Sequence, residues 1–83
     1  MFDAGVVIGF GTDAGPPGRV PGYSEHWELA ELVKVGLTPA QAIHAATGQA
    51  AELLGTRDLG TITRVSWADL IVLDDDPTAN ILN

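Results

Sequence analysis

The spacing of apolar residues predicts that the chain opens with a buried strand followed by a loop. Residues 6–10 form a nearly continuous apolar run between glycines, which is typical of a strand covered on both faces, as in a parallel sheet. Residues 14–23 contain three prolines and three glycines and predict a loop, since proline removes hydrogen-bond donors and glycine removes stiffness. This order places Asp13 at the carboxyl end of the strand.

Two amphipathic helices are predicted next. Ser24 is the expected N-cap of the first helix, and Gly36 is its expected left-handed terminator. Thr38 is the expected N-cap of the second helix, where Gln41 completes a capping box, and Gly55 ends that helix. The apolar residues at helical spacing are Leu29, Leu32, Val33, Ile43, Ala46, Ala50, Leu53 and Leu54.

After Gly55 the pattern becomes β-type. Residues 60–63 and 67–73 predict two strands separated by a short turn at 64–66. The three aspartates before Pro77 predict a solvated turn, because aspartate stabilises turns and proline breaks strands. The tail ends with Ile81 and Leu82, which we expect to dock on the rest of the chain.

Composition narrows the possible functions. The 83 residues allow one small domain, and a hydrophobic content of 46% is normal for a folded chain. The formal net charge of −7 disfavours binding to nucleic acid and to anionic membranes. The absence of cysteine excludes disulfides and thiolate metal sites and leaves a cytoplasmic location as the default.

Three residues are candidates for chemistry. Asp13 ends a strand where α/β proteins place active-site groups, although an aspartate beside glycine and proline is by itself more often a turn former. His26 is close enough to the strand end to line a substrate pocket, while a solvent-facing residue in a first helical turn is the simpler interpretation. His44, in the middle of a helix, is expected to be structural or exposed.

The succession of segments resembles the C-terminal region of the amidohydrolase superfamily, in its imidazolonepropionase- and prolidase-like branch. The resemblance covers nearly the whole chain. Each segment alone is a weak match, and it is their combination in this order that is specific. It rests on Gly11-Thr12-Asp13 and on residues 28–42, 45–47, 50–55, 59–62, 68–73 and 76–77.

This resemblance implies an α/β fold that is the C-terminal fragment of a (β/α)8 barrel, with its last strand and two helices, plus strands of a small flanking β-sandwich. Residues 1–55 would belong to the barrel and residues 56–83 to the sandwich. The family hydrolyses amides, lactams and related C–N bonds with one or two divalent metals, zinc being expected. Asp13 matches the aspartate that contacts the metal and accepts a proton from the attacking water.

The sequence also departs from the family pattern. It has no counterpart of the family's His-x-His pair, its bridging lysine or acid, or its later histidines, and one aspartate cannot supply the three ligands of a catalytic zinc. The family usually has glycine and a basic residue where this chain has Val65, Ser66 and Trp67. We therefore expect no metal to bind to this chain alone.

Two classes of function remain open. The first is a C-terminal fragment of an amidohydrolase, inactive alone, whose complete relative acts on a small amide-type molecule. The second is a noncatalytic α/β module that associates with itself or with a complementary fragment. An isolated buried strand leaves unpaired edges, so both classes predict a homo-oligomer or a complementary partner chain.

Overall fold

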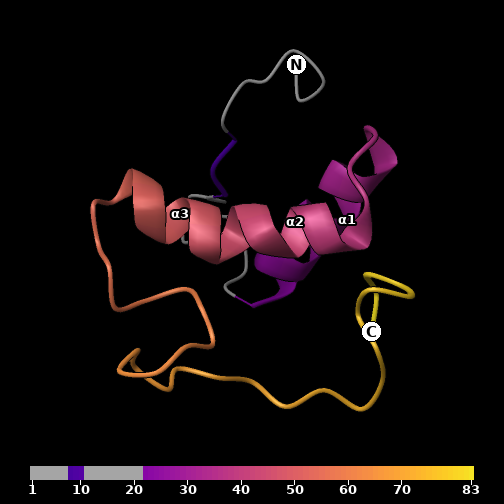
Figure 1. The fold of residues 1–83 in the computed structure, drawn as a ribbon. Helices are drawn as coiled ribbons and strands as arrows, with labels where there is room; N and C mark the ends of the chain where they lie inside the picture. The colour runs from indigo at the N-terminus through magenta and orange to yellow at the C-terminus, as the bar shows by residue number, and fades with distance from the viewer. Residues whose placement is uncertain (1–7, 11–21) are drawn as a thin grey trace.

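A computed structural model describes residues 8–10 and 22–83, and its regular structure is helical (Figure 1). Helix α1 spans Tyr23–Lys34, α2 spans Pro39–Ala46 and α3 spans Gly48–Leu53. Beyond α3 the chain continues as an irregular segment that passes along one side of the helices and returns near α1 (Figure 1). No helix among the described residues is long and apolar enough to cross a membrane.

Helix α1 begins two residues before the position expected from the sequence. Its N-cap is Gly22, with φ 87°, and the Gly22 N–H donates to the Glu25 carboxylate. The prediction that Ser24 caps this helix is therefore wrong, because a glycine in a left-handed conformation and a returning glutamate provide the start instead. The predicted end is confirmed: Gly36 has φ 127°, and its N–H donates to the Val33 carbonyl at 3.1 Å.

The start of α2 matches the prediction. The Gln41 N–H donates to the Thr38 hydroxyl at 3.2 Å, and the Thr38 N–H donates to the Gln41 side chain at 2.8 Å. Pro39 occupies the first helical position, where its missing N–H costs no hydrogen bond.

The prediction of one continuous helix from Thr38 to Gly55 is wrong, because the helix breaks at Thr47. This residue has φ −119° and ψ −87°, and its hydroxyl donates to the Ile43 carbonyl at 2.7 Å. A threonine that bonds back to the preceding turn, followed by flexible Gly48, is a recognised cause of helix bending.

The break at Thr47 is covered by the loop that follows α3. A Cβ placed on Gly60 would lie 2.5 Å from the Thr47 carbonyl oxygen and 2.9 Å from the Ala51 Cβ. Gly60 also has φ +84°, so both the space and the backbone conformation require glycine.

The buried core is small. Among residues 8–10 and 22–83 it comprises five side chains, three of them alanines that let the helices approach closely: Leu37, Ala42, Ala45, Ala51 and Ile81. Burial of Ile81 confirms that the C-terminal tail docks on the helices, whereas Leu82 stays 63% exposed. The accessible surface of 6456 Å² exceeds the roughly 4,700 Å² typical of a folded 8.7 kDa monomer.

The predicted β-type region is not sheet in this structure. Neither residues 60–63 nor residues 67–73 form a strand, and residues 8–10 do not either. A strand requires a neighbouring backbone to pair with, and none of the described segments lies in pairing register with these residues. The rest of the first predicted strand lies outside the described residues.

The turn between the two predicted strands does form. The Ser66 N–H donates to the Thr63 carbonyl at 3.2 Å, and the two hydroxyls lie 2.6 Å apart. Val65 within this turn has φ 63° and is 97% exposed. A β-branched residue in the left-handed region is strained, and the resemblance to the family placed a glycine in this short stretch.

We predict that Gly60→Ala destabilises the chain more than Gly55→Ala does. Both glycines have positive φ, +84° and +77°, but only Gly60 has backbone atoms within contact range of an added Cβ. The cost of placing a residue with a Cβ in the left-handed conformation should be similar in both variants, about 1 kcal/mol of the free energy of unfolding. Urea unfolding measures the free energy of unfolding of each variant. The extra decrease in Gly60→Ala is the energy of the contact between Gly60 and the helix break at Thr47. Equal decreases in the two variants would contradict this prediction.

We also predict that Val65→Gly stabilises the chain. Glycine removes the cost of the left-handed conformation, about 1–2 kcal/mol, but adds entropy to the unfolded chain, so the net gain should be about 0.5–1 kcal/mol. Val65→Ala is the matched control, because alanine keeps a Cβ in the same conformation. An unfolding midpoint that is unchanged or lowered in Val65→Gly would refute the strain at this turn.

Candidate functional site

Asp13, the main candidate from the sequence, lies outside the described residues. The structure places the second candidate, His26, in the first turns of α1 with its side chain exposed to solvent. His26 lines two adjoining cavities, one of about 280 Å³ and one of about 480 Å³. The expectation that His26 faces solvent is thus met, and the same side chain borders a hollow large enough for a small molecule.

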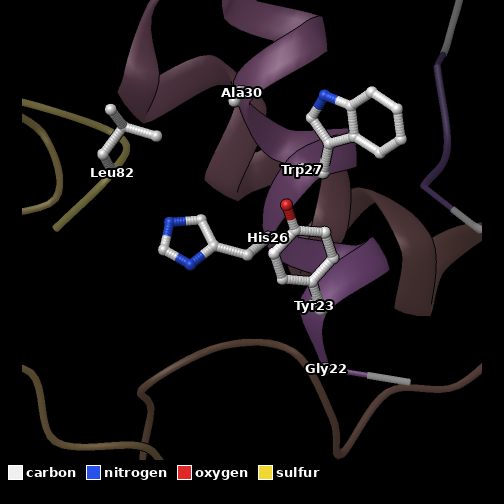
Figure 2. A pocket seen from close by; sticks show the side chains of 6 residues that line it. All are labelled: Gly22, Tyr23, His26, Trp27, Ala30 and Leu82. Carbon is white, nitrogen blue, oxygen red and sulfur yellow. The ribbon is translucent and has the colours of Figure 1, made fainter. Parts of the chain in front are cut away.

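The smaller cavity is formed by one face of α1 and by the C-terminal tail. Tyr23, His26, Trp27 and Ala30 recur at the three- and four-residue spacing that puts side chains on the same face of a helix. In Figure 2 the imidazole of His26 extends toward Leu82, while the rings of Tyr23 and Trp27 lie together on the adjacent side of the helix. The cavity therefore has aromatic walls and few polar groups.

The larger cavity separates the helices from the C-terminal segment. Its walls are mainly apolar and include Leu29 from α1, Ile43 from α2, and Ile71, Leu73 and Ile81 from the C-terminal segment. The irregular segment thus lies across the apolar faces of two helices without filling the space between them.

One ion pair lies next to the aromatic wall. The Trp27 indole N–H donates to a Glu31 carboxylate oxygen at 3.2 Å, and the Lys34 ammonium lies 4.0 Å from the same carboxylate. The Lys34 and Glu31 side chains are 78% and 48% exposed, so water screens the pair and it adds little stability. The hydrogen bond to Glu31 orients the Trp27 indole along the helix.

In the part of the chain that the structure describes, neither histidine belongs to a group of side chains that could hold a metal ion. His44 is exposed, as expected, and its imidazole lies over the first residue of α3, where a Cβ on Gly48 would be 3.2 Å from Nδ1. Across residues 8–10 and 22–83, no three carboxylate, imidazole or thiol side chains come together as a metal ion would need. The described residues therefore do not fit a catalytic metal ion by themselves.

The aspartates before Pro77 organise a turn. The Asp76 carboxylate accepts the Thr78 hydroxyl at 2.6 Å and the Thr78 N–H at 2.9 Å, and the Asn83 side chain donates to the Asp76 carbonyl at 2.8 Å. The hydrogen bond from the Thr78 hydroxyl, followed by the one from its N–H, holds the pKa of Asp76 below its ordinary value. The prediction of a turn here is confirmed.

The arrangement can accommodate a small apolar or planar group beside an imidazole. Among the described residues its lining is aromatic and apolar, with the His26 imidazole and the Tyr23 hydroxyl as the polar side-chain groups. Sequence reasoning missed Tyr23, Trp27 and Leu82 as members of this region. The spacing of Tyr23 and Trp27 around His26 was the available signal, whereas the return of Leu82 depends on tertiary structure.

Comparison with known proteins identifies relatives over almost all of the chain. The model of a family described as the amidohydrolase family matches residues 1–83. An imidazolonepropionase from Deinococcus deserti is 40% identical over 74 residues, which cover 88% of this chain and 18% of that protein. A 5-methylthioadenosine/S-adenosylhomocysteine deaminase from Haloquadratum walsbyi is 38% identical, covering 100% of this chain and 21% of that protein.

A third relative, an imidazolonepropionase from Streptomyces griseus, is 32% identical over 89% of this chain and 19% of its own length. No solved structure matches the chain significantly. The chain thus spans about a fifth of the length of the curated relatives it matches.

We predict that Thr78→Val raises the pKa of Asp76, because valine keeps the shape of threonine but removes the hydroxyl donor. Because the pKa of Asp76 is lower in the folded chain than in the unfolded chain, its ionised carboxylate stabilises the folded state at pH values above the unfolded-state pKa. This stabilisation is lost as the pH falls through the folded-state pKa. Carboxyl chemical shifts followed through an NMR titration measure the change. Thr61→Val, remote from the turn, should leave Asp76 unaffected; an unchanged Asp76 titration in Thr78→Val would contradict the assignment.

Proposed function

Because the chain belongs to the amidohydrolase family, we propose that it forms part of a metal-dependent hydrolase that cleaves C–N bonds of small amide- or lactam-type molecules. The observation that carries this proposal is the family match, which extends over residues 1–83 and so includes Asp13. Relatives named as imidazolonepropionases and as a deaminase support hydrolase chemistry.

We propose that the chain is inactive alone. It spans about a fifth of the length of its relatives, and its described residues do not gather the three ligands of a catalytic zinc. The ligands of the divalent ion, which we propose to be zinc, would come mainly from the part of an amidohydrolase chain that this chain does not match. We also propose that residues 1–55 belong to the barrel and residues 56–83 to the sandwich. A cytoplasmic location is proposed as well.

Two residues have proposed roles. Asp13 would act as the base that accepts a proton from the attacking water, because a short carboxylate at a strand end can be aimed accurately. His26 would lie on the substrate side of the site. The two cavities that its side chain borders support this role.

A noncatalytic, self-associating module is the second candidate. Apolar side chains in the C-terminal segment are exposed, among them Ile62 at 89% and Val72 at 99%, and such surface favours association. The formal charge of −7 on each copy opposes close pairing of identical chains, so this candidate ranks below the hydrolase.

The proposed function predicts a specific loss in an Asp13→Asn variant. The assay protein is the Deinococcus deserti imidazolonepropionase in which residues 1–83 of this chain replace the matching segment. Loss of the base should lower kcat about 100-fold or more, while the metal content measured by mass spectrometry tests whether the site still assembles. Asp58→Asn, which alters an exposed aspartate after α3, is the control and should retain activity.

Two results would contradict the proposal. Full activity in the Asp13→Asn chimera would remove the proposed role of this carboxylate. Metal-dependent amide hydrolysis by the purified 83-residue chain would show that it carries a complete catalytic centre.

A further inference from the structure

Two aromatic side chains are exposed on one face of α1. Tyr23 is 73% and Trp27 is 60% exposed, although side chains of this kind usually bury most of their surface in a folded protein. They lie four residues apart, so the helix brings the two rings to the same side (Figure 2). Both line the smaller cavity of about 280 Å³, together with His26 and Leu82. The two rings are therefore accessible to a molecule that enters this cavity.

A carboxylate adjoins the aromatic pair. The Trp27 indole N–H donates to a Glu31 carboxylate oxygen at 3.2 Å. Glu31 continues the four-residue spacing of Tyr23 and Trp27 along the same face of the helix. A negative charge is thus held at the edge of a ring that lines the cavity.

The electrostatics of the surroundings favour a positively charged ligand. Helix α1 carries three glutamates, Glu25, Glu28 and Glu31, against one basic residue, Lys34, and the whole chain has a formal net charge of −7. Such a field attracts cations and repels anions. The faces of aromatic rings are also negative, so tryptophan and tyrosine attract a cation placed over the ring. The charge and the aromatic walls therefore select the same kind of ligand.

We propose that the smaller cavity binds a small organic cation whose quaternary or methylated ammonium group lies against the rings of Tyr23 and Trp27, with the Glu31 carboxylate as the opposing charge. The methyl groups of such a cation contact the apolar walls, while its charge interacts with the rings and with Glu31. A neutral molecule of the same shape gains only the apolar contacts. The inference goes beyond the proposed function and does not depend on it, because binding requires no hydrolysis.

The test titrates choline into the purified 83-residue chain. The matched ligand is the neutral alcohol in which a carbon atom replaces the choline nitrogen. Ring currents should move the NMR signal of the choline methyl protons upfield, and the fluorescence of Trp27 in a Trp67→Phe background gives a second reading. We expect a Kd of about 1–10 mM for choline and binding about fivefold weaker or more for the neutral alcohol.

A methylated ammonium group can belong to a free solute or to a lipid head group. Sedimentation of the chain with phosphatidylcholine vesicles distinguishes these two sources. Choline binding together with cosedimentation would assign the site to a lipid head group, and choline binding without cosedimentation would assign it to a free cation.

Removing the indole should remove the site. Trp27→Leu is expected to abolish the upfield shift of the choline methyl protons and to weaken binding about tenfold or more. Trp67→Leu is the matched control, because Trp67 is 69% exposed and does not line the cavity. Circular dichroism of each variant measures whether the helices are retained.

Two charge variants decide the matter even if Trp27→Leu loses helix. Glu31→Gln keeps an oxygen that accepts the indole N–H but removes the charge, so it should weaken choline binding about threefold and leave binding of the neutral alcohol unchanged. Lys34→Gln should strengthen choline binding, because the Lys34 ammonium lies 4.0 Å from the Glu31 carboxylate and partly neutralises it. A general loss of structure cannot produce opposite changes in affinity.

Three results would overturn the inference. The first is the absence of choline binding, and the second is equal affinity for choline and the neutral alcohol, which would show an apolar hollow without preference for charge. The third is choline affinity that Glu31→Gln and Lys34→Gln leave unchanged or change in the same direction. None of these measurements uses turnover, so failure of the proposed hydrolase function in the chimera would leave the cation site standing.

Discussion

The structure depends on a small contact region where the break between α2 and α3 meets the loop after α3. Gly60 lies against the Thr47 carbonyl and the Ala51 methyl group, and Ala51 is among the few buried side chains. Because alanines make up most of the buried side chains in the described part of the chain, this close approach of the backbone supplies packing that larger side chains provide in other small domains. Apart from Ile81, the large apolar residues that follow Gly60 stay exposed.

The elements that the sequence predicted well are those decided by local interactions. The capping box of Thr38 and Gln41, the terminator Gly36 and the turn before Pro77 each depend on residues within a few positions of one another. The predicted start of α1 was two residues late because Gly22 and Ser24 are both acceptable caps, and the choice between them rests on the contact of Gly22 with Glu25. Local interactions thus sufficed to predict the end of α1 and the start of α2.

The elements that the sequence predicted poorly depend on distant partners. The β propensity of residues 67–73 is plain, but a strand exists only beside another strand, and the described residues contain none for it to join. The break at Thr47 likewise combines a local hydroxyl bond with the remote Gly60. For the candidate site, sequence located His26 correctly at the start of α1, whereas Leu82 reached the cavity through the folding of the tail.

The segment at residues 67–73 has a further consequence for the chain in solution. A short stretch of high β propensity with little charge and no proline is the composition that initiates aggregation. Asp69 within it and the three aspartates immediately after it are placed where gatekeeper charges stand in natural sequences. Substituting these acids by neutral residues would remove the electrostatic repulsion between exposed segments of different molecules. The negative charge of these aspartates therefore keeps the isolated chain from aggregating through this segment.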